Sequence, residues 1–261
     1  MSITRIFAMI LRHYYILVHS IDQMTSTFFW SFLDVFLWGF TSAYLRYMNN
    51  NLVEISTALL SGLILWLIVN RANYEIGIAL MEEIWNQNLI NIFSSPLKFS
   101  EWVISALLIG LFKIIVAIGL ASLMAYILYA ANIFSLGFYF IPFVVNLILF
   151  GWATGFVTAG LVFRYGTSIQ ALVWTGIYIL MPFSAVYYPV SILPPIGQLV
   201  AKILPTAYIF EGMRQILYHH TFDINNLLSA TTLNLIYLTL GILILHRLFN
   251  VSKEKGLARL E

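Results

Sequence analysis

Residues 82–99 read EEIWNQNLINIFSSPLKF and form the clearest amphipathic stretch in a chain of long apolar segments. Its apolar positions recur at helical spacing and are Trp85, Leu89, Ile92 and Phe93. A polar face follows the same spacing and consists of Glu83, Gln87, Asn91 and Ser94. Pro96 ends the predicted helix, because proline lacks a backbone donor and disfavours helix in the residue before it. A helix this short cannot span a bilayer, so we expect it to lie in the interface and offer one face to a soluble partner.

The composition of the whole chain is that of an integral membrane protein. Of its 261 residues, 61% are hydrophobic and 9% are charged, whereas a soluble domain carries about 25% charged residues. So few charges cannot cover a soluble fold of this size. The net charge of +2 offers no electrostatic footprint for nucleic acid, and the absence of cysteine excludes disulfides and thiolate metal sites. We therefore predict an all-α polytopic membrane protein with a single transmembrane domain over residues 1–261.

Six segments are long enough to span a bilayer, for which about 20 mostly apolar residues are needed. They are residues 27–47, 53–78, 102–130, 137–163, 168–188 and 225–248, so that residues 27–188 hold the first five spans. Residues 1–23 also have helical apolar spacing, but Arg12 and His13 interrupt it. These two residues break the uncharged core that a cleaved signal peptide requires. We expect an interfacial helix there, with a tilted extra span as the alternative.

Positive residues near the ends of spans indicate on which side each loop lies. With both termini inside, nine Lys and Arg residues fall on the inner side, three fall on the outer side and one lies within a span. The inner set is Arg5, Arg12, Arg71, Lys98, Arg164, Arg247, Lys253, Lys255 and Arg259, the outer set is Arg46, Lys202 and Arg214, and Lys113 lies within a span. We predict cytoplasmic termini, with residues 249–261 as a short cytoplasmic tail.

Small residues and one proline modify the predicted spans. Gly151, Gly155 and Ala159 form a ridge on the fourth span where a second helix can approach closely, although glycine is also simply common in membrane helices. Pro182 lies inside the fifth span, so we expect it to kink that helix.

Residues 189–224 are too polar and too rich in proline to form a span. We expect two short half-helices separated at Pro205 and Thr206, preceded by Pro194, in a hairpin that dips in from the outer face. Glu211 and Arg214 are three residues apart and can pair on one helix face. We predict that this re-entrant hairpin lines or caps the outer exit of a conduit; an ordinary outer loop with one surface helix is the alternative.

Four charged residues fall inside predicted spans and form a candidate polar cluster. Asp34 lies in the first span, Arg71 and Glu75 in the second and Lys113 in the third. A lone charge at the centre of a span costs about 2.5–3.5 kcal/mol, so such residues usually face the protein interior and pair. We predict that Asp34 meets Lys113 or Arg71, either locking three helices together or forming an inner gate that receives a polar headgroup.

Motifs for independent catalysis are absent from the sequence. No glycine is followed by lysine, so the chain has no G-x-x-x-x-G-K-[ST] phosphate loop, and neither H-E-x-x-H nor G-x-S-x-G occurs. His219 and His220 are adjacent and lack the i,i+4 spacing of a chelating pair on a helix. We expect no catalytic residues, no metal and no cofactor bound by this chain.

Taken together, the chain resembles the membrane (permease) subunit of ATP-binding-cassette (ABC) exporters of the second exporter type. The resemblance is carried by the N-terminal interfacial helix, by the acidic and then amphipathic segment that ends in Ser95-Pro96, and by a late pattern of Leu193-Pro194, Pro205-Thr206 and Arg214. In that family the amphipathic segment is a coupling helix that docks on a separate ATPase. Many relatives have Gly-Thr and a nearby Glu where this chain has Gln87-Asn88 and Asn91. The coupling residues that the resemblance implies are Glu82, Glu83, Trp85, Asn86, Gln87, Leu89, Phe93 and Pro96.

The same resemblance implies the partners and the function. Two copies of a cytoplasmic ABC ATPase, which hold ATP and Mg, would drive two permease chains in a bacterial inner membrane. A homodimer is favoured over a heterodimer, membrane lipid surrounds the spans, and an amphiphile such as a lipid, lipid-linked glycan or drug is exported. The alternatives are a polytopic membrane enzyme acting on lipids, for which no polar cluster at one membrane face stands out, and a secondary transporter, for which no repeated halves are found.

Overall fold

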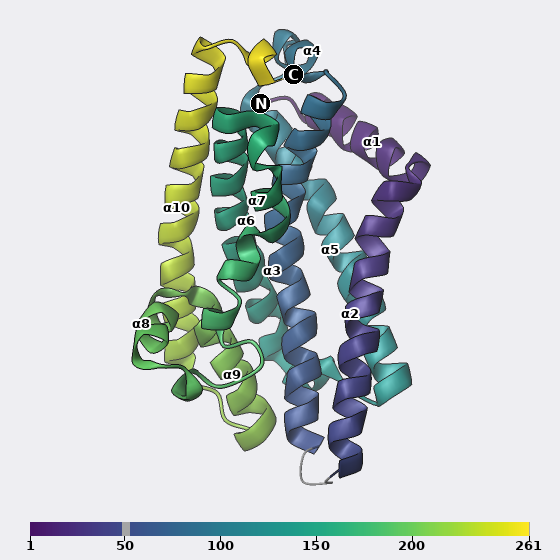
Figure 1. Ribbon diagram of the computed structural model, residues 1–261, viewed down its shortest axis with the longest axis vertical. Coiled ribbons are helices and arrows are strands. Elements are labelled where there is room, and N and C mark those ends of the chain that lie inside the picture. Colours follow the sequence, from purple (N-terminus) through teal and green to yellow (C-terminus); the bar gives the residue numbers. More distant parts are fainter. Residues whose placement is uncertain (49–52, 261) are drawn as a thin grey trace.

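The protein is a bundle of long helices in a computed structural model that describes residues 1–48 and 53–260 (Figure 1). The long helices are α2 Ile21–Met48, α3 Val53–Trp85, α5 Phe99–Tyr129, α6 Phe140–Tyr165 and α10 Ile224–Glu254. The shorter ones are α1 Ile3–His19, α4 Leu89–Ser94, α7 Gln170–Thr175, α8 Pro195–Ile203 and α9 Pro205–His219. The 3₁₀ turns are η2 Ile133–Tyr139, η3 Gly166–Ile169, η4 Gly176–Ile179, η5 Pro182–Ser184, η6 Val190–Ile192 and η7 Leu257–Leu260. Within the described ranges there is no β-strand.

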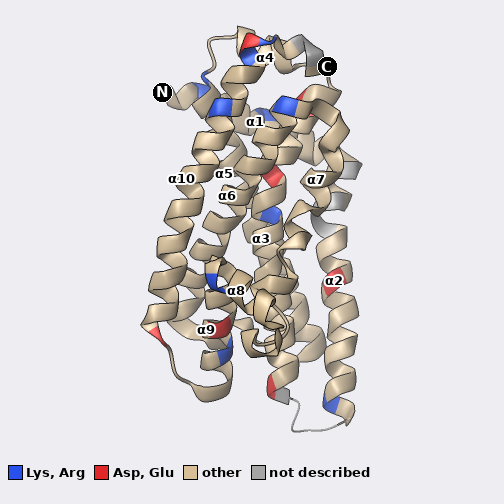
Figure 2. Ribbon diagram, turned by 60° about the vertical axis from the view of Figure 1, so that its left-hand side comes forward, with Lys and Arg blue, Asp and Glu red and all other residues tan. Residues whose placement is uncertain are grey.

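Five segments of the described chain are long and apolar enough to cross a membrane, which confirms the all-α polytopic membrane class. They are Gln23–Met48, Glu54–Trp85, Phe99–Tyr129, Ile133–Ser184 and Ile224–Glu254. Both chain ends and α4 lie at one end of the bundle, which we call the terminal end, whereas α8 and α9 lie in the opposite half, at the hairpin end (Figure 1). Figure 2 shows several of the Lys and Arg residues near the N-terminus and α4, at the terminal end.

The predicted fifth span over residues 168–188 does not form one continuous helix. α6 ends at Tyr165, and Gly166 adopts a φ of 65° that turns the chain back beside α6. The returning segment is a single short helix, α7, followed by 3₁₀ turns. It is rich in glycine and β-branched residues, which lower helix propensity, and α7 already ends at Thr175. Pro182 therefore opens a 3₁₀ turn instead of kinking a long helix.

The ridge of small residues on α6 does allow a close approach to α3, as the sequence predicts. A Cβ atom at Gly151 would lie 2.8 Å from the carbonyl oxygen of Val69, and one at Gly155 would lie 2.7 Å from that of Asn73. Real Cβ atoms do not come this close to backbone, so only glycine permits this helix separation. α3 is thereby held in the centre of the bundle, and its central segment is largely buried.

Helix α1 lies obliquely across the terminal end, where it packs against α5 and α2 (Figure 1). One face of α1 is buried through Met9, His13 and Leu17, while Ile3 and Phe7 on the other face are exposed. This amphipathic helix therefore has the shape and the surface expected of an interfacial helix.

Candidate functional site

Two cavities of similar size lie beside α3, and each has a volume of about 360 Å³. The one farther from the terminal end, which we call the Asp34 cavity, is lined by Trp30, Ser31, Asp34, Leu67, Asn70, Arg71, Tyr74, Trp174 and Tyr178. The other, which we call the Glu82 cavity, is lined by Ile16, Ser20, Gln23, Tyr74, Ile78, Glu82, Trp85, Asn86, Lys113 and Trp174. Helices α2, α3 and α7 contribute walls to the first cavity, and α1, α2, α3, α5 and α7 contribute to the second. Polar and aromatic side chains thus line two cavities at different distances from the terminal end of the helix bundle.

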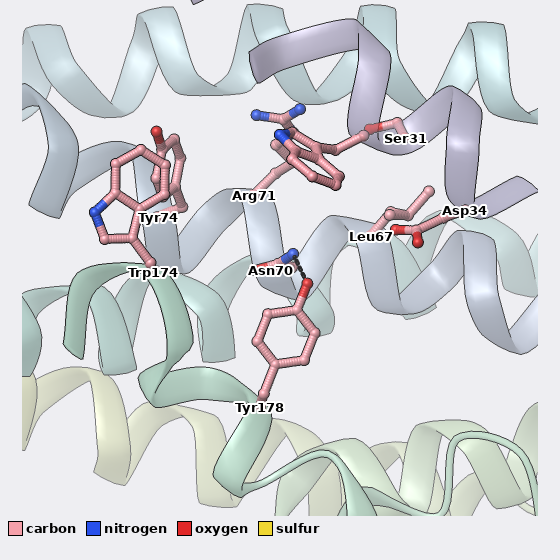
Figure 3. Close-up of a pocket in the computed structure, with 9 residues that line it drawn as sticks. Ser31, Asp34, Leu67, Asn70, Arg71, Tyr74, Trp174 and Tyr178 are labelled. Carbon is pink, nitrogen blue, oxygen red and sulfur yellow. Dashed lines mark hydrogen bonds between the residues drawn. The ribbon is translucent and has the colours of Figure 1, made fainter. Parts of the chain in front are cut away.

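Tyr74 and Trp174 belong to the walls of both cavities. Their ring centroids are 5.1 Å apart, and the ring planes are tilted by 54°. Figure 3 shows the two rings next to each other at one edge of the Asp34 cavity, with Trp174 reaching across from α7. The Tyr74–Trp174 pair therefore stands where the two cavities meet.

Three of the four predicted intramembrane charges come together, and the pairing differs in part from the prediction. The Lys113 ammonium lies 2.7 Å from the Glu75 carboxylate, and Arg71 lies 4.0 Å from the other oxygen of the same carboxylate. The Glu75 side chain is only 4% exposed. Buried charged side chains are normally paired. Because Arg71 and Glu75 belong to α3 and Lys113 belongs to α5, these three side chains link the two helices.

Asp34 does not join Lys113, contrary to the prediction, because α5 presents Lys113 to Glu75 on α3. Within the described residues, no Lys or Arg nitrogen lies within 4.0 Å of the Asp34 carboxylate. Asp34 and Arg71 instead line the same cavity, and Figure 3 shows their charged groups apart, with the carboxylate beside Leu67. Asp34 stands halfway along α2 and is half-buried.

The predicted amphipathic helix of residues 82–99 is divided at Gln87, whose φ is 51°. Glu82, Glu83 and Trp85 belong to the last turn of α3, and α4 begins only at Leu89. Trp85 is 48% exposed and does not share the apolar face of α4. Leu89 is buried and Phe93 lies 5.1 Å from Phe249, ring centroid to ring centroid, so the two residues anchor α4 to the bundle.

Glu83 faces the protein interior, although the sequence suggests a docking carboxylate. It is 1% exposed, and the Arg12 guanidinium donates to both of its oxygens, one bond measuring 2.8 Å. Asn88 donates a further bond of 3.2 Å. Glu82 accepts a bond from the Gln23 amide and lines the Glu82 cavity.

The sequence did not lead us to predict that α1 binds the chain on both sides of α4. We call helix α1, Ile3–His19, the strap. Arg5 lies 2.8 Å from Glu101 on α5 and donates a bond of 2.8 Å to the Pro96 carbonyl. Arg12 holds Glu83 at the end of α3, so the strap fixes the chain on both sides of α4. Arg5 and Arg12 are seven residues apart and share a helix face, a signal that was available in the sequence.

The strap also buries one histidine. His13 is 6% exposed, and its Nε2 has no hydrogen-bond partner. Burial lowers the pKa of the His13 imidazole to about 4; Glu83 opposes this shift, whereas Arg12 and Lys113 add to it. The Arg12 pKa is raised, mainly by its hydrogen bonds to Glu83. At neutral pH the interface therefore holds a charged Arg12 and a neutral His13.

The hairpin end forms as two helices that meet at Pro205, as predicted. α8 ends at Ile203, and α9 begins at Pro205. Arg214 pairs with Glu211 at 3.2 Å and donates a bond of 2.7 Å to the Ala185 carbonyl.

Further bonds fasten the hairpin to the segment that precedes it. The Glu211 carboxylate accepts a bond of 2.6 Å from the Val190 N–H. Thr206 donates a bond of 2.8 Å to Ser184, whereas Pro194 is exposed at the start of α8. Glu211, Arg214 and Thr206 thus tie the hairpin to the chain that follows α7.

A search of protein families finds none whose sequence profile matches this chain, and no curated protein matches it either.

Proposed function

We propose that this chain is the permease subunit of an ABC exporter, moving an amphiphilic substrate such as a lipid, lipid-linked glycan or drug outward. The observation that carries the proposal is the pair of cavities beside α3, which meet at Tyr74 and Trp174. Together they place polar and aromatic surface from the terminal end to the middle of the bundle. An amphiphile needs such a surface for its headgroup, while its apolar part stays against the membrane.

The energy source in this proposal is a separate ATPase, because the sequence has no phosphate loop. The surface available to it at the terminal end consists of Trp85, Asn86, Gln87, Ile90 and Asn91, all of which are exposed. We call this set the docking surface. Glu83 serves it indirectly, by holding the end of α3 against the strap.

The remaining features of the proposal follow from the resemblance and the charge pattern. Two ATPase copies carrying ATP and Mg would serve two permease chains, which are copies of this chain or one copy with a second permease. Both termini would lie on the cytoplasmic side of a bacterial inner membrane, and the six passes would include residues 166–184 as a broken fifth pass. The hairpin would then lie at the outer exit.

Co-purification with a separate ABC ATPase tests the proposal. The double variant Trp85→Ala/Ile90→Ala should reduce the ATPase recovered by about tenfold, because exposed anchors of this kind carry much of the binding energy of an interface. The matched control is Ile196→Ala/Leu199→Ala, which truncates two exposed apolar residues at the hairpin end. An ATPase that binds the docking variant and the control equally well would refute docking at this surface.

A secondary transporter remains the second candidate, since one observation favours it. Secondary transporters bind substrate at broken helices near mid-membrane, and the segment after α6 is broken beside the Asp34 cavity. Substrate movement by the purified chain alone, driven by a proton or sodium gradient, would support this candidate against the permease.

A further inference from the structure

The Asp34 cavity combines one carboxylate with four aromatic side chains. The aromatic residues are Trp30, Tyr74, Trp174 and Tyr178. Trp30, Trp174 and Tyr178 are exposed, so the cavity is reached from the outside of the bundle between α2 and α7. Asn70 donates a bond of 2.8 Å to the Tyr178 hydroxyl and so fixes that ring in the wall (Figure 3).

The charge of Asp34 is not neutralised by a close cation of the described chain. Lys113 pairs with Glu75 at 2.7 Å, and Arg71 lies 4.0 Å from the same carboxylate. A carboxylate halfway along a spanning helix is costly unless it is paired. A ligand that brings a positive charge into the cavity would offset that cost.

The aromatic rings select the kind of cation. An ammonium group is attracted to the faces of Trp and Tyr within about 6 Å of the ring centre, and this attraction grows when water is excluded. Quaternary and primary ammonium groups on an apolar chain match a cavity with such walls that is reached from the outside of the bundle. Arg71 lines the same cavity, so an anionic group next to the ammonium would lie near a guanidinium.

We propose that the Asp34 cavity binds the ammonium group of an amphiphile, with the positive charge against Asp34 and the aromatic rings around it. The source is either a zwitterionic membrane lipid, whose phosphate lies next to the ammonium, or a cationic compound destined for export. The inference rests on the proposed function only where it takes the ligand to be the exported substrate. Binding itself requires no ATPase.

Equilibrium binding to the purified full chain in dodecyl maltoside micelles tests the proposal. The probes are radiolabelled dodecyltrimethylammonium, which is cationic, dodecylphosphocholine, which is zwitterionic, and dodecanol, which is neutral. Asp34→Asn should weaken binding of the first two by about tenfold or more and leave dodecanol unchanged, because only the charge is removed. Glu54→Gln is the control, since Glu54 is an exposed carboxylate outside the cavity.

A second pair of variants tests the aromatic walls and covers the case in which Asp34→Asn fails to fold. Trp30 and Phe32 are close on α2 and similarly exposed, at 58% and 48%, but only Trp30 lines the cavity. Trp30→Leu should weaken binding of the ammonium probes, whereas Phe32→Leu should not.

The outcomes separate the two sources and the two hypotheses. Tighter binding of dodecylphosphocholine supports a lipid headgroup, and tighter binding of dodecyltrimethylammonium supports an exported cation. Equal ammonium binding by the wild type and Asp34→Asn, or by Trp30→Leu and Phe32→Leu if Asp34→Asn does not fold, overturns the proposal. Neither result changes ATPase co-purification, so the proposed function stands or falls separately.

Discussion

At the residue scale, buried charges are held by specific partners that the sequence does not reveal. The sequence identifies Asp34, Arg71, Glu75 and Lys113 as intramembrane. Counting residues along each span predicts how deep each residue lies in the membrane, but not which residue it pairs with. Partner choice depends on which helices are neighbours. Since α3 packs against α5, Glu75 meets Lys113, and Asp34 on α2 faces a cavity instead.

The Glu75–Lys113 pair gives the first prediction. Lys113→Met should lower stability by about 3–5 kcal/mol, because it leaves the buried Glu75 carboxylate without its closest cation. The double variant Glu75→Gln/Lys113→Met should recover part of the loss, as measured by thermal unfolding in detergent. Lys202→Met is the control, because Lys202 is exposed. A double variant as unstable as Lys113→Met alone would show that the two residues are not coupled.

His13 gives a prediction for pH dependence. In the docked strap its pKa is about 4, and in the undocked strap it takes the ordinary value of 6.5, so protonation favours undocking as the pH falls below 6.5. At pH 5.5 the docked strap should be weaker by about 1.4 kcal/mol than at pH 7.5. Hydrogen exchange of α1 measures this change. The charged groups that act on the His13 pKa in the docked strap are Arg12, Glu83 and Lys113.

Two variants show whether His13 is the group responsible. His13→Phe should keep α1 protected at both pH values, since no proton can be taken up. His19→Gln, which changes an exposed histidine on the same helix, should keep the pH dependence of the wild type. Loss of protection at pH 5.5 in His13→Phe would assign the effect to another group.

At the element scale, helical periodicity identifies the helices but does not show where they break. Apolar spacing runs from Trp85 through Leu89 to Phe93 without interruption, yet the positive φ of Gln87 ends α3 and separates α4. Nothing in the residue type announces that turn, because glutamine has no preference for positive φ. Residues 166–184 break for a similar reason. Their apolar length suffices for a span, but they pack against α6 and α3 as one short helix and 3₁₀ turns.

The small-residue ridge gives a prediction about helix packing. Gly155→Val should destabilise the protein by about 1–3 kcal/mol, because the new side chain collides with the backbone of Asn73 on α3. Gly119→Val on α5 is the matched control, since a Cβ there meets no atom within 4 Å. Thermal unfolding of both variants measures the difference. Equal melting temperatures would mean that α6 and α3 do not pack through this glycine.

At the scale of the whole molecule, the sequence predicts the class of the protein better than its candidate site. Apolar length and sparse charge indicate a helical membrane protein, and the described chain has five segments long and apolar enough to cross a membrane. Both termini lie at one end of the bundle (Figure 1). The two cavities could not be foreseen, because Trp30, Tyr74, Trp174 and Tyr178 come from three separate parts of the chain and look like ordinary membrane aromatics.

Transport in proteoliposomes that contain this chain and an ABC ATPase that co-purifies with it tests the proposed permease function most directly. We predict that ATP drives a labelled amphiphile across the bilayer, that a non-hydrolysable ATP analogue does not, and that Trp85→Ala/Ile90→Ala stops the transport while the chain still inserts. Movement of the amphiphile at the same rate without the ATPase, or with the docking variant, would contradict the proposed function.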